Sequence, residues 1–408
     1  MNLNIVIVND FAHVNGGASE VAVLSAISLA KQGYAVTFFA AVPPIDPELK
    51  NYANVKIICM GQYDILKDPN RFRAAVQGIW NFSAARSMAQ LLDTLIPSNT
   101  IIHLHSWTKS LSSSIVRVAI KKGFKVLCTM HDYFLACPNG GFFNYPKNEI
   151  CHLSPLSAKC IMTNCDVRNY PQKLWRVSRQ VVQKYLGFTP DGIKDFIAVS
   201  DFSKAILETF LPKNARIYTV NNPIDVSKSD PVSVHRNNFF VYVGRLSREK
   251  GPHLFAKAAS ILGLNAIFIG DGPLRDEISS ICPSAEITGW LPRKEVYRLL
   301  NSARALIFPS LWYETQGLVV LKAAAMGVPV IVSNTSAARD LVADGLTGLW
   351  FKSGDLNDLI MKIQVLQNPD IAKKMGQMAY ERYWQNPLTI DRHISQLEEC
   401  YKKVLEIY

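Results

Sequence analysis

The sequence has no long apolar run. Its longest weakly polar stretch, residues 34–45, is far shorter than the ~20 residues that a helix needs to cross a bilayer. The first ten residues contain no Lys or Arg and end in Asp10, so a secretory signal peptide is not expected. These absences favour a cytoplasmic protein, in which the eight cysteines are not expected to form a disulfide framework.

The composition excludes low-complexity and disordered classes. The 408 residues include 22 Gly and 21 Pro, which are ordinary counts and too few for a collagen-like chain. With 49% hydrophobic and 19% charged residues, the chain is able to fill sizeable cores. The length predicts two domains of ordinary size.

The sequence also lacks the patterns of a nucleic-acid-binding protein, although it is basic. No helix-turn-helix, RNP or zinc-finger pattern is found. The formal net charge is +11, and residues 1–190 carry 19 Lys and Arg against 10 Asp and Glu, which leaves +9 for the first half and +2 for the second. An anionic membrane surface or a phosphorylated substrate explains this better than nucleic acid, and a solvated basic surface is the simplest alternative.

Short β-branched runs alternate with helix-like stretches along the whole chain. The run at residues 5–8 is followed by a glycine loop, an apolar-periodic helix over 21–31 and a second strand over 35–41. Such a unit forms parallel sheet through a right-handed crossover. We therefore predict an α/β fold of two doubly wound, Rossmann-like domains. The further strands are expected at 101–104, 124–130, 196–199, 239–243, 266–269, 305–308 and 328–332.

The domain boundary is expected at residues 222–238, where a Ser/Asp/Pro-rich stretch interrupts both periodicities. This linker separates an N-terminal domain, residues 1–221, from a C-terminal domain, residues 239–387. The tail, residues 388–408, has apolar residues spaced for one face of a long helix, which is expected to cross back to the first domain. That face consists of Ile390, Ile394, Leu397, Tyr401, Val404 and Tyr408.

Two cations follow the first predicted strand of the C-terminal domain. Arg245 comes directly after Val243-Gly244, and Lys250 lies five residues further on. The loop after a parallel strand borders the crevice in which such sheets bind ligands, so both cations are able to neutralise a diphosphate. The alternative is a surface pair beside an acid such as Glu249.

A carboxylate lies at a second junction of this domain. Glu314 is located between the strand predicted over 305–308 and a helix start that follows Gly317. Backbone N–H groups at a helix start favour an anion, and a carboxylate there accepts hydrogen bonds from sugar hydroxyls. This combination indicates a site for a phosphorylated sugar.

Four motifs of the second half together resemble the donor domain of retaining family 4 glycosyltransferases, which have the GT-B fold. Each motif is common by itself, whereas the four in this order and approximate spacing are specific. The resemblance covers most of the chain and implies an acceptor-binding domain and a donor-binding domain that face a central cleft. The motifs are Gly244-Arg245…Lys250-Gly251, Gly270-Asp271-Gly272-Pro273, Glu314…Gly317 and Gly327-Val328-Pro329-Val330.

The resemblance assigns roles to individual residues. Arg245 and Lys250 match the pair that holds the nucleotide diphosphate. Glu314 matches the first glutamate of the family's E-x7-E motif, which contacts the donor sugar. Backbone groups are implied to bind the rest of the donor: Gln316, Gly317 and Leu318 the sugar hydroxyls and phosphate, and Leu291 the base.

The sequence departs from the family at one position. The second glutamate of the E-x7-E motif, which usually holds the ribose hydroxyls, is replaced by Lys322. An ammonium group cannot accept those hydrogen bonds, so Lys322 is expected to alter the nucleotide contacts or to add a third cation near the phosphates. The replacement also leaves open a non-catalytic GT-B subunit that binds a partner transferase.

The first half fits the same family. Gly16 and Gly17 follow the first strand, where the family's glycine loop faces the diphosphate, and they do not form the G-x-G-x-x-G pattern of a dinucleotide dehydrogenase. His131 follows the strand at 124–130 and matches a histidine that lies beside the donor sugar. With Arg245, Lys250 and Glu314 it completes the expected catalytic set. His103 and His105 are assigned to structure or to the lining of the acceptor cleft.

The resemblance implies transfer of a sugar from a UDP- or GDP-sugar with retention of configuration. In this group the acceptor hydroxyl attacks on the side from which the nucleotide leaves, and no divalent metal is required. Together with the basic first half, this predicts a lipid-linked or saccharide acceptor in bacterial surface polysaccharide synthesis, at the inner face of the cytoplasmic membrane. A nucleotide-sugar epimerase with the same fold is an alternative enzyme.

Four cysteines cluster after His131. They lie in a stretch rich in Pro, Asn, Gly and Ser, which is expected to be a long irregular excursion. Four thiolates bind zinc tetrahedrally, although the paired C-x2-C spacing is missing. A structural zinc is therefore one interpretation and buried free thiols are the other. The cysteines are Cys137, Cys151, Cys160 and Cys165.

A basic amphipathic stretch follows these cysteines. Residues 168–184 carry five Lys or Arg and no acid, interleaved with apolar residues such as Trp175. This pattern is typical of a helix that lies on anionic lipid. The alternative is a domain helix with its apolar face in the core and its cations in water.

Overall fold

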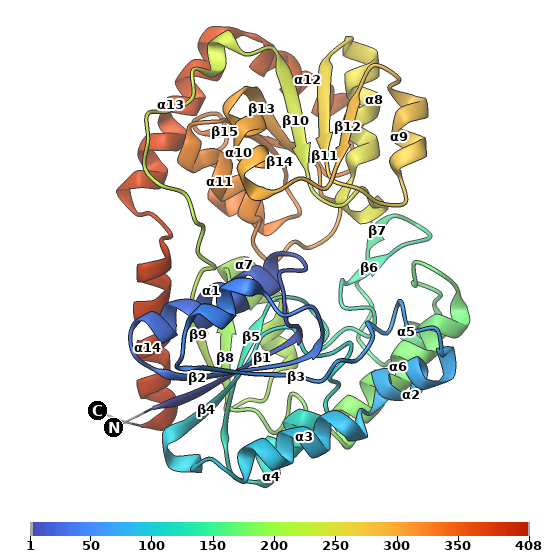
Figure 1. Ribbon diagram of the computed structural model, residues 1–408. Coiled ribbons are helices and arrows are strands. Elements are labelled where there is room, and N and C mark those ends of the chain that lie inside the picture. The colour runs from blue at the N-terminus through green and yellow to red at the C-terminus, as the bar shows by residue number, and fades with distance from the viewer. Residues whose placement is uncertain (1–2, 407–408) are drawn as a thin grey trace. The chain divides into compact units, whose positions relative to one another are not determined.

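The computed structural model describes residues 3–406, which divide into two compact units. Unit 1 consists of residues 3–141, 153–223 and 389–406, and unit 2 of residues 142–152 and 224–388. Each unit is a parallel sheet covered by helices (Figure 1). The predicted α/β fold with two Rossmann-like domains is confirmed.

Unit 1 is built on a seven-stranded sheet in which all neighbouring strands are parallel. The order β3-β2-β1-β4-β5-β8-β9 reverses direction between β1 and β4, as in doubly wound folds. The strands are β1 (Asn4–Phe11), β2 (Ala35–Val42), β3 (Val55–Cys59), β4 (Thr100–Leu104), β5 (Lys125–Met130), β8 (Asp195–Ala198) and β9 (Arg216–Thr219).

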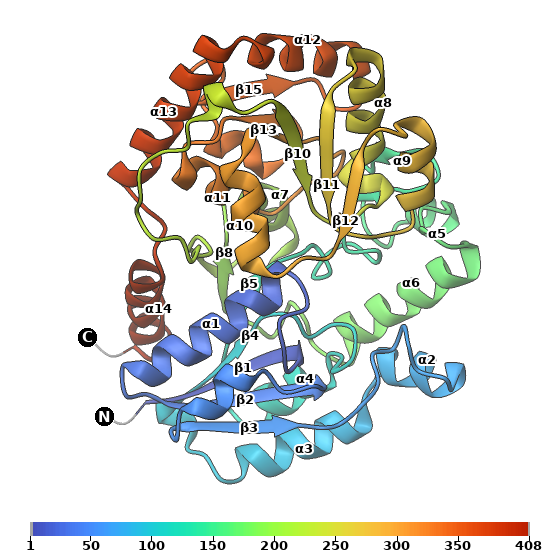
Figure 2. The same cartoon turned by 45° about the horizontal axis from the view of Figure 1, so that its top comes forward.

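Helices cover both faces of this sheet (Figure 2). Helices α1 and α14 share one hydrophobic cluster with β1, and α3 and α4 lie on the other face. The helices of unit 1 are α1 (Gly17–Lys31), α2 (Arg71–Ile79), α3 (Phe82–Leu92), α4 (Ser114–Lys121), α5 (Ala158–Met162), α6 (Tyr170–Tyr185), α7 (Asp201–Leu207) and α14 (Ile390–Leu405).

The central strand and the C-terminal helix show why this order forms. Residues 5–8 of β1 are fully buried, as a β-branched run covered on both faces must be. Helix α14 turns its apolar stripe into the same core, and Tyr401 Oη lies 2.8 Å from His103 Nδ1 in β4. The tail helix therefore crosses back to the first domain as predicted, whereas Tyr408 lies outside the described residues.

Unit 2 contains a six-stranded parallel sheet in the order β12-β11-β10-β13-β14-β15. Its strands are β10 (Phe239–Val243), β11 (Asn265–Ile269), β12 (Glu286–Gly289), β13 (Ala303–Phe308), β14 (Val330–Ser333) and β15 (Gly348–Phe351). Its helices are α8 (Pro252–Leu262), α9 (Arg275–Ile281), α10 (Arg293–Asn301), α11 (Leu318–Met326), α12 (Leu356–Gln367) and α13 (Pro369–Gln385).

The excursion after His131 is more ordered than the sequence predicts. It contains a short hairpin, β6 (Phe143–Asn144) and β7 (Glu149–Ile150), followed by α5. The hairpin segment, residues 142–152, belongs to unit 2, although unit 1 precedes and follows it in the chain. The reason is Phe143, which is fully buried in the hydrophobic core of unit 2.

A membrane-crossing helix is not found among residues 3–406, since none of the helices there is both long and apolar enough.

Candidate active site

The carboxyl edge of the unit 2 sheet carries the predicted donor residues. The chain leaves β10 into Gly244-Arg245, and it leaves β13 into the segment that contains Glu314. Strands β10 and β13 are neighbours at the point where the strand order reverses. Ligands of open α/β sheets bind at such a point, so the topology brings both segments to the expected binding edge.

Lys250 and Glu314 are in direct contact at this edge. Lys250 Nζ lies 2.5 Å from Glu314 Oε1, and Ser310 Oγ donates to the same oxygen at 2.8 Å. Burial by itself would raise the pKa of Glu314, but the Lys250 charge and these hydrogen bonds hold it below its ordinary value. Lys250 also lies 4.9 Å above the ring of Trp312. The carboxylate is therefore ionised and fixed in orientation.

A glycine allows the Lys250 turn to approach β13. Gly251 has φ +69, and a Cβ there would lie 2.0 Å from the carbonyl oxygen of Pro309. Leu311 N–H donates to the carbonyl of Glu249 at 2.8 Å, which joins the two loops. The contact between Lys250 and Glu314 thus depends on a backbone approach that only glycine permits.

Arg245 is exposed at the same edge. Its carbonyl accepts a hydrogen bond from Tyr242 Oη at 2.7 Å, which fixes the backbone of the turn. Within the part of the chain that the structure describes, its guanidinium group has no hydrogen-bond or ion-pair partner. The N–H donors of this guanidinium group are therefore available to bind an anion.

Helix α11 begins beside Glu314. Gly317, at φ +106, precedes its first turn, Leu318 is its first residue, and Gln316 is buried immediately before it. The N–H groups of a first helical turn have no partner within the helix, so they point towards any ligand at this edge. The predicted donor-binding backbone and the Glu314 carboxylate therefore lie close together in the chain, within residues 314–318.

Two further predicted donor residues lie on separate elements of unit 2. Lys322 is in α11, with Nζ 6.0 Å above the ring of Tyr297. Leu291 follows β12 and packs partly buried against the core, whereas its neighbour Trp290 is 67% exposed. Their assigned roles towards the nucleotide stay predictions.

In unit 1, His131 follows β5 and belongs to a stack of histidines. His105 Nδ1 lies 3.0 Å from His131 Nε2, and the two rings are stacked with centroids 5.2 Å apart. His103 contacts Tyr401 Oη and Thr129 Oγ1, both at 2.8 Å, which gives it a structural role. Burial lowers the pKa of His131 to about 3, so its imidazole is neutral near pH 7.

The predicted glycine loop also lies at the carboxyl edge of the unit 1 sheet. Gly16 has φ +103 and precedes α1, in which Gly17 is the first residue. The loop therefore leads directly into the N-terminus of a fifteen-residue helix. This is the arrangement that binds anions in other α/β proteins, and its role towards the diphosphate stays a prediction.

Asp10 is a buried acid that the sequence did not single out. Its carboxylate accepts backbone N–H groups of Lys109 at 3.0 Å, Ser110 at 2.9 Å and Leu111 at 2.8 Å. It thereby orders the loop after β4. Burial raises its pKa to about 6, although these hydrogen bonds oppose the shift. The sequence feature that could have identified Asp10 is an acidic residue at the end of a buried strand.

The four clustered cysteines are divided between the two units. No group of three or more His, Cys, Asp or Glu in residues 3–406 is placed to hold a metal ion. Cys151 lies in the hairpin segment of unit 2, whereas Cys137, Cys160 and Cys165 lie in unit 1. The amine of Lys173 contacts two of the sulfurs, Cys165 Sγ at 3.2 Å and Cys160 Sγ at 3.5 Å. The structural zinc at the four cysteines stays a prediction.

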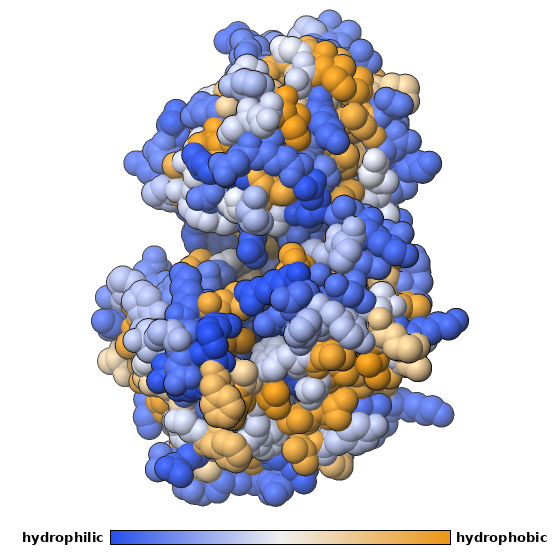
Figure 3. Space-filling view, turned by 90° about the vertical axis from the view of Figure 1, so that its right-hand side faces the viewer, coloured by the Kyte–Doolittle hydropathy of each residue, from blue (hydrophilic) through white to orange (hydrophobic). Residues whose placement is uncertain are grey.

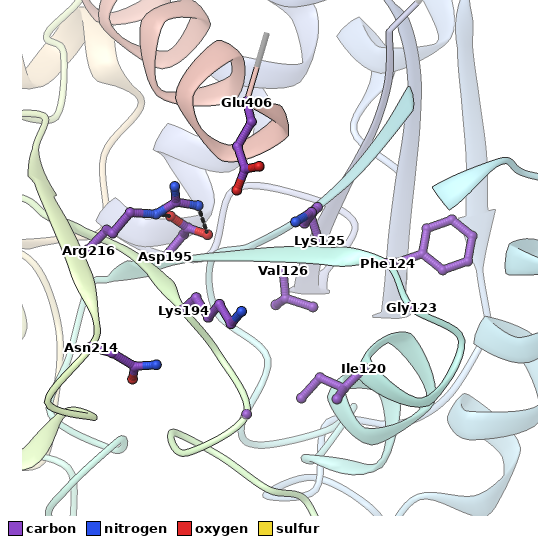
Figure 4. Close-up of a pocket in the computed structure, with 11 residues that line it drawn as sticks. Ile120, Gly123, Phe124, Lys125, Val126, Lys194, Asp195, Asn214, Arg216 and Glu406 are labelled. Carbon is purple, nitrogen blue, oxygen red and sulfur yellow. Dashed lines mark hydrogen bonds and ion pairs between the residues drawn. The ribbon is translucent and has the colours of Figure 1, made fainter. Parts of the chain in front are cut away.

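A pocket of about 500 Å³ lies at the opposite edge of the unit 1 sheet (Figure 4). It is lined by residues at the amino ends of β5, β8 and β9. Two of its charged groups pair with each other, since Arg216 Nε lies 2.7 Å from Asp195 Oδ1. Because His131 follows the carboxyl end of β5, this pocket is separate from the predicted site.

Comparison with known families agrees with this geometry. The family model described as Glycosyltransferase Family 4 matches residues 15–228, which is more than half of the chain. The chain belongs to glycosyltransferase family 4. The family model described as Glycosyl transferases group 1 matches residues 224–382, which lie in unit 2. The resemblance identified from the sequence motifs is therefore confirmed.

Relatives of this family 4 chain include enzymes with different acceptors. It is 30% identical over 308 residues to a glycogen synthase of Mycobacterium tuberculosis, covering 68% of this chain and 70% of that one. It is 24% identical over 212 residues to an Escherichia coli galactosyltransferase named for UDP-Gal and a GlcNAc-diphosphoundecaprenol acceptor, covering 46% and 54%. Relatives of this kind support sugar transfer without naming the acceptor here.

Solved structures show the same fold. A sucrose-phosphate synthase of Thermosynechococcus elongatus has a TM-score of 0.72 at 19% identity, and both chains are covered completely. Anabaena Alr3699/HepE in complex with UDP-glucose has a TM-score of 0.67 at 14% identity, with 98% of this chain and 100% of that chain covered.

Proposed function

We propose that this chain is a retaining glycosyltransferase that moves a sugar from a UDP- or GDP-sugar to a lipid-linked or saccharide acceptor in bacterial surface polysaccharide synthesis. The observation that carries the proposal is the Lys250–Glu314 contact next to the start of α11. It combines a cation, an ionised carboxylate and helix N–H groups within one edge of unit 2. These are the groups that a sugar diphosphate needs.

Each group has a distinct task in this proposal. Arg245 and Lys250 neutralise the diphosphate and stabilise the charge that develops on it as it leaves. The Glu314 carboxylate accepts hydrogen bonds from the donor sugar and fixes its orientation. The acceptor hydroxyl attacks from the side of the leaving diphosphate, which takes the proton, so that no divalent metal is required. The protein contributes positioning and electrostatic stabilisation.

The histidine of unit 1 contributes as a neutral group. Because the pKa of His131 is about 3, its imidazole exchanges hydrogen bonds with a sugar hydroxyl without carrying charge. The contact with His105 holds the ring in place. His131 therefore orients the donor sugar and is not assigned to general acid or base catalysis.

One relative supports the lipid-linked acceptor, and a second supports the surface-polysaccharide role. The E. coli relative is named for an acceptor that carries a diphosphoundecaprenol group. A Klebsiella pneumoniae protein described as lying in the cps region is 23% identical over 355 residues, covering 83% of this chain. The surplus of positive charge in the first half suits an acceptor whose phosphates lie at a membrane surface.

Helix α6 supports contact with that surface, although not in the manner expected from the sequence. The sequence left two interpretations of this helix, and both placed its cations outside the core, in lipid headgroups or in water. In the structure Lys173 and Arg179 are buried instead. The exposed stripe of α6 is instead largely apolar, with Leu174 41%, Val181 38% and Tyr185 66% exposed. The helix is therefore turned with its polar face inward, so its apolar side chains are available to lipid.

The apolar surface of unit 1 continues onto α2. Trp175 Nε1 of α6 donates to the carbonyl of Ala75 in α2 at 3.0 Å, which joins the two helices. Phe72 and Phe82 are 80% and 70% exposed, and they line a pocket of about 590 Å³. Figure 3 shows apolar side chains gathered on this side of unit 1. Exposed apolar groups of this extent mark interaction surfaces, and we assign this one to the membrane.

The first test is a screen of purified protein against UDP- and GDP-sugars. A donor that binds the folded chain raises its melting temperature, since ligands stabilise the state that they bind. Incubation of that donor with lipid-linked saccharide acceptors, followed by NMR of the product, reports transfer and anomeric configuration. An inverted product, or conversion of the donor without an acceptor, would contradict the proposal.

The second test addresses the membrane. We expect the chain to sediment with phosphatidylglycerol vesicles and less with phosphatidylcholine vesicles. The Leu174→Ser/Val181→Ser variant should lose binding. A Met361→Ser/Val365→Ser variant on the exposed face of α12 serves as the matched control. Equal sedimentation of all three proteins would exclude α6 as the membrane-binding element.

Lys322 favours one alternative function. A non-catalytic subunit that supports a partner transferase has no need of the ribose contact that Lys322 replaces. Sugar transfer by the purified chain without any partner excludes this alternative. Donor binding without transfer to any acceptor in the screen supports it.

A further inference from the structure

The pocket of about 590 Å³ in unit 1 has no task in the proposed sugar transfer. It lies where the loop after β3 meets the corner between α2 and α3. Its walls carry the aromatic side chains of Tyr63, Phe72, Trp80 and Phe82. Contact with a flat lipid surface requires exposed apolar groups but no hollow, whereas a cavity of this size is typical of a site for a small apolar ligand.

The walls of this pocket are held in place by side chains of unit 1. Asn81 Nδ2 donates to Gln62 Oε1 at 2.9 Å, which joins the α2–α3 corner to the loop after β3. Arg73 donates to both carboxylate oxygens of Asp68, from Nε at 2.9 Å and from Nη2 at 2.7 Å, which joins α2 to the same loop. The pocket is therefore formed before a ligand binds, and a preformed site loses less entropy on binding.

The lining of the pocket favours a neutral, apolar ligand. Among the described residues it contains one anion and one cation, Asp68 and Arg73, and these neutralise each other. The amide groups of Asn81 and Gln62 bind each other, and Asn81 also donates to the carbonyl of Ser110 at 2.7 Å. A saccharide needs hydrogen-bond partners for its hydroxyls, so a hydrocarbon chain fits this lining better.

The pocket lies at the same edge of the sheet as the other predicted groups of unit 1. Gly61 lines it and follows β3, whose last residue is Cys59. Gly16 follows β1 and His131 follows β5, so all three segments leave the carboxyl ends of parallel strands. Only β2 separates β3 from β1, which places these two strands roughly 10 Å apart at about 4.8 Å per strand. A molecule bound by its head beside β1 is thus able to lay its tail into the pocket.

We propose that this pocket binds the first isoprene units of the polyprenyl chain of the acceptor. The inference rests on the proposed function, which includes a lipid-linked acceptor. The diphosphate and the saccharide of the acceptor then lie towards β1, and the chain beyond the pocket continues along the apolar surface of α2 and α6 into the membrane. The pocket thereby selects acceptors by their lipid and holds the first part of that lipid out of the bilayer.

Farnesol, a short uncharged isoprenoid alcohol, is the probe for the pocket itself. Equilibrium dialysis of the full chain in detergent-free buffer should show saturable binding. Ser83→Trp adds bulk at an exposed position of the wall and should weaken this binding at least about tenfold, because the ring occupies the space of the apolar chain. Ile96→Ser removes a side chain that is 61% exposed outside the pocket, and it should leave the affinity unchanged. Binding that does not saturate, or equal binding with Trp at position 83, would overturn the proposal.

Two further variants separate the pocket from a folding defect and from the membrane-facing surface. Phe82→Ser removes a 70% exposed side chain of the wall, should also weaken farnesol binding, and decides the question if Ser83→Trp does not fold. Leu174→Ser/Val181→Ser should lose vesicle binding but keep farnesol binding. Loss of farnesol binding in that variant would place the probe on α6 and contradict the pocket.

The role towards the acceptor is tested by transfer assays on two acceptors with the same saccharide diphosphate, one with a polyprenyl chain and one with a methyl group. Ser83→Trp should raise the KM for the first acceptor at least about tenfold and leave the KM for the second unchanged. An equal rise for both would mean that the pocket holds the saccharide, against the proposal. If the chain transfers no sugar to either acceptor, the proposed function fails, whereas saturable farnesol binding still shows an isoprenoid site.

Discussion

Lys250 Nζ and Glu314 Oε1 are 2.5 Å apart, although 64 residues separate them in the sequence. The pair joins the turn after β10 to the segment after β13. It leaves the carboxylate ionised and the ammonium group beside the start of α11. Its two members are assigned to adjoining parts of the donor, the diphosphate and the sugar.

Replacement of Lys250 by Met should lower turnover about 10²–10³-fold, because a preorganised charge that stabilises the leaving diphosphate is lost. Steady-state kinetics with the donor found in the screen measure this. Arg248→Met is the matched control, since Arg248 lies on the same turn and pairs with Glu277 at 2.6 Å. Near-normal turnover of the Lys250 variant would refute its role at the diphosphate.

Replacement of Gly251 by Ala should destabilise the chain by at least about 2 kcal/mol, since the new Cβ meets a carbonyl oxygen in a left-handed backbone. Gly263→Ala is the matched control. That glycine also has a positive φ, +60, but a Cβ there meets nothing within 4 Å. Chemical denaturation compares the two variants, and an equal loss in both would show that the close approach to Pro309 is not what matters.

Asp10 should make stability dependent on pH. Its pKa is about 6 in the folded chain against 3.8 ordinarily, so the folded state keeps the proton longer and stability falls as pH rises through this window. The total effect is at most about 3 kcal/mol. In Asp10→Asn the free energy of unfolding should no longer show this fall between pH 4 and about 6. In Asp191→Asn, at an exposed position, the fall should remain. Urea unfolding at a series of pH values measures this, and the same pH dependence of unfolding free energy in both variants would contradict the prediction.

Lys322 is expected either to alter the nucleotide contacts or to add a third cation near the donor phosphates, and donor affinity tests the second of these. Lys322→Met should then weaken donor binding about fivefold, and Lys322→Glu should weaken it more, because a carboxylate repels the diphosphate. Calorimetry on both variants measures this, with Lys362→Met on α12 as the control. Affinity unchanged by Lys322→Glu would mean that the position has no special role, and tighter binding would mean that it contacts the ribose.

The sequence predicted the inner strands of both sheets and missed the outer ones. Runs such as residues 5–8 are β-branched and fully buried, which gives a strong local signal. The four outer strands, β3, β9, β12 and β15, were not predicted. In β3, β9 and β12 most residues are only partly buried, so their apolar pattern is diluted by polar side chains.

The order of motifs along the chain identified the donor residues, but it did not predict which of them are in contact. Spacing brought out Arg245, Lys250 and Glu314 as candidates, and no local rule predicts that the last two touch. Asp10 was missed because a single acid after a strand is common, and its three N–H partners come from residues about one hundred positions away. The inward-facing cations of α6 were missed for a related reason, since Arg179 donates to the carbonyl of Pro138 in an irregular segment and Lys173 contacts the sulfurs of Cys160 and Cys165.

The hairpin at residues 142–152 determines how this protein can be divided. The chain passes between the two units four times, after residues 141, 152, 223 and 388. A fragment that begins at residue 224 therefore lacks Phe143 and leaves a hole lined by apolar groups in its own core. Expression of the donor half as a soluble fragment should require grafting these eleven residues back, for instance through a short glycine-rich connection.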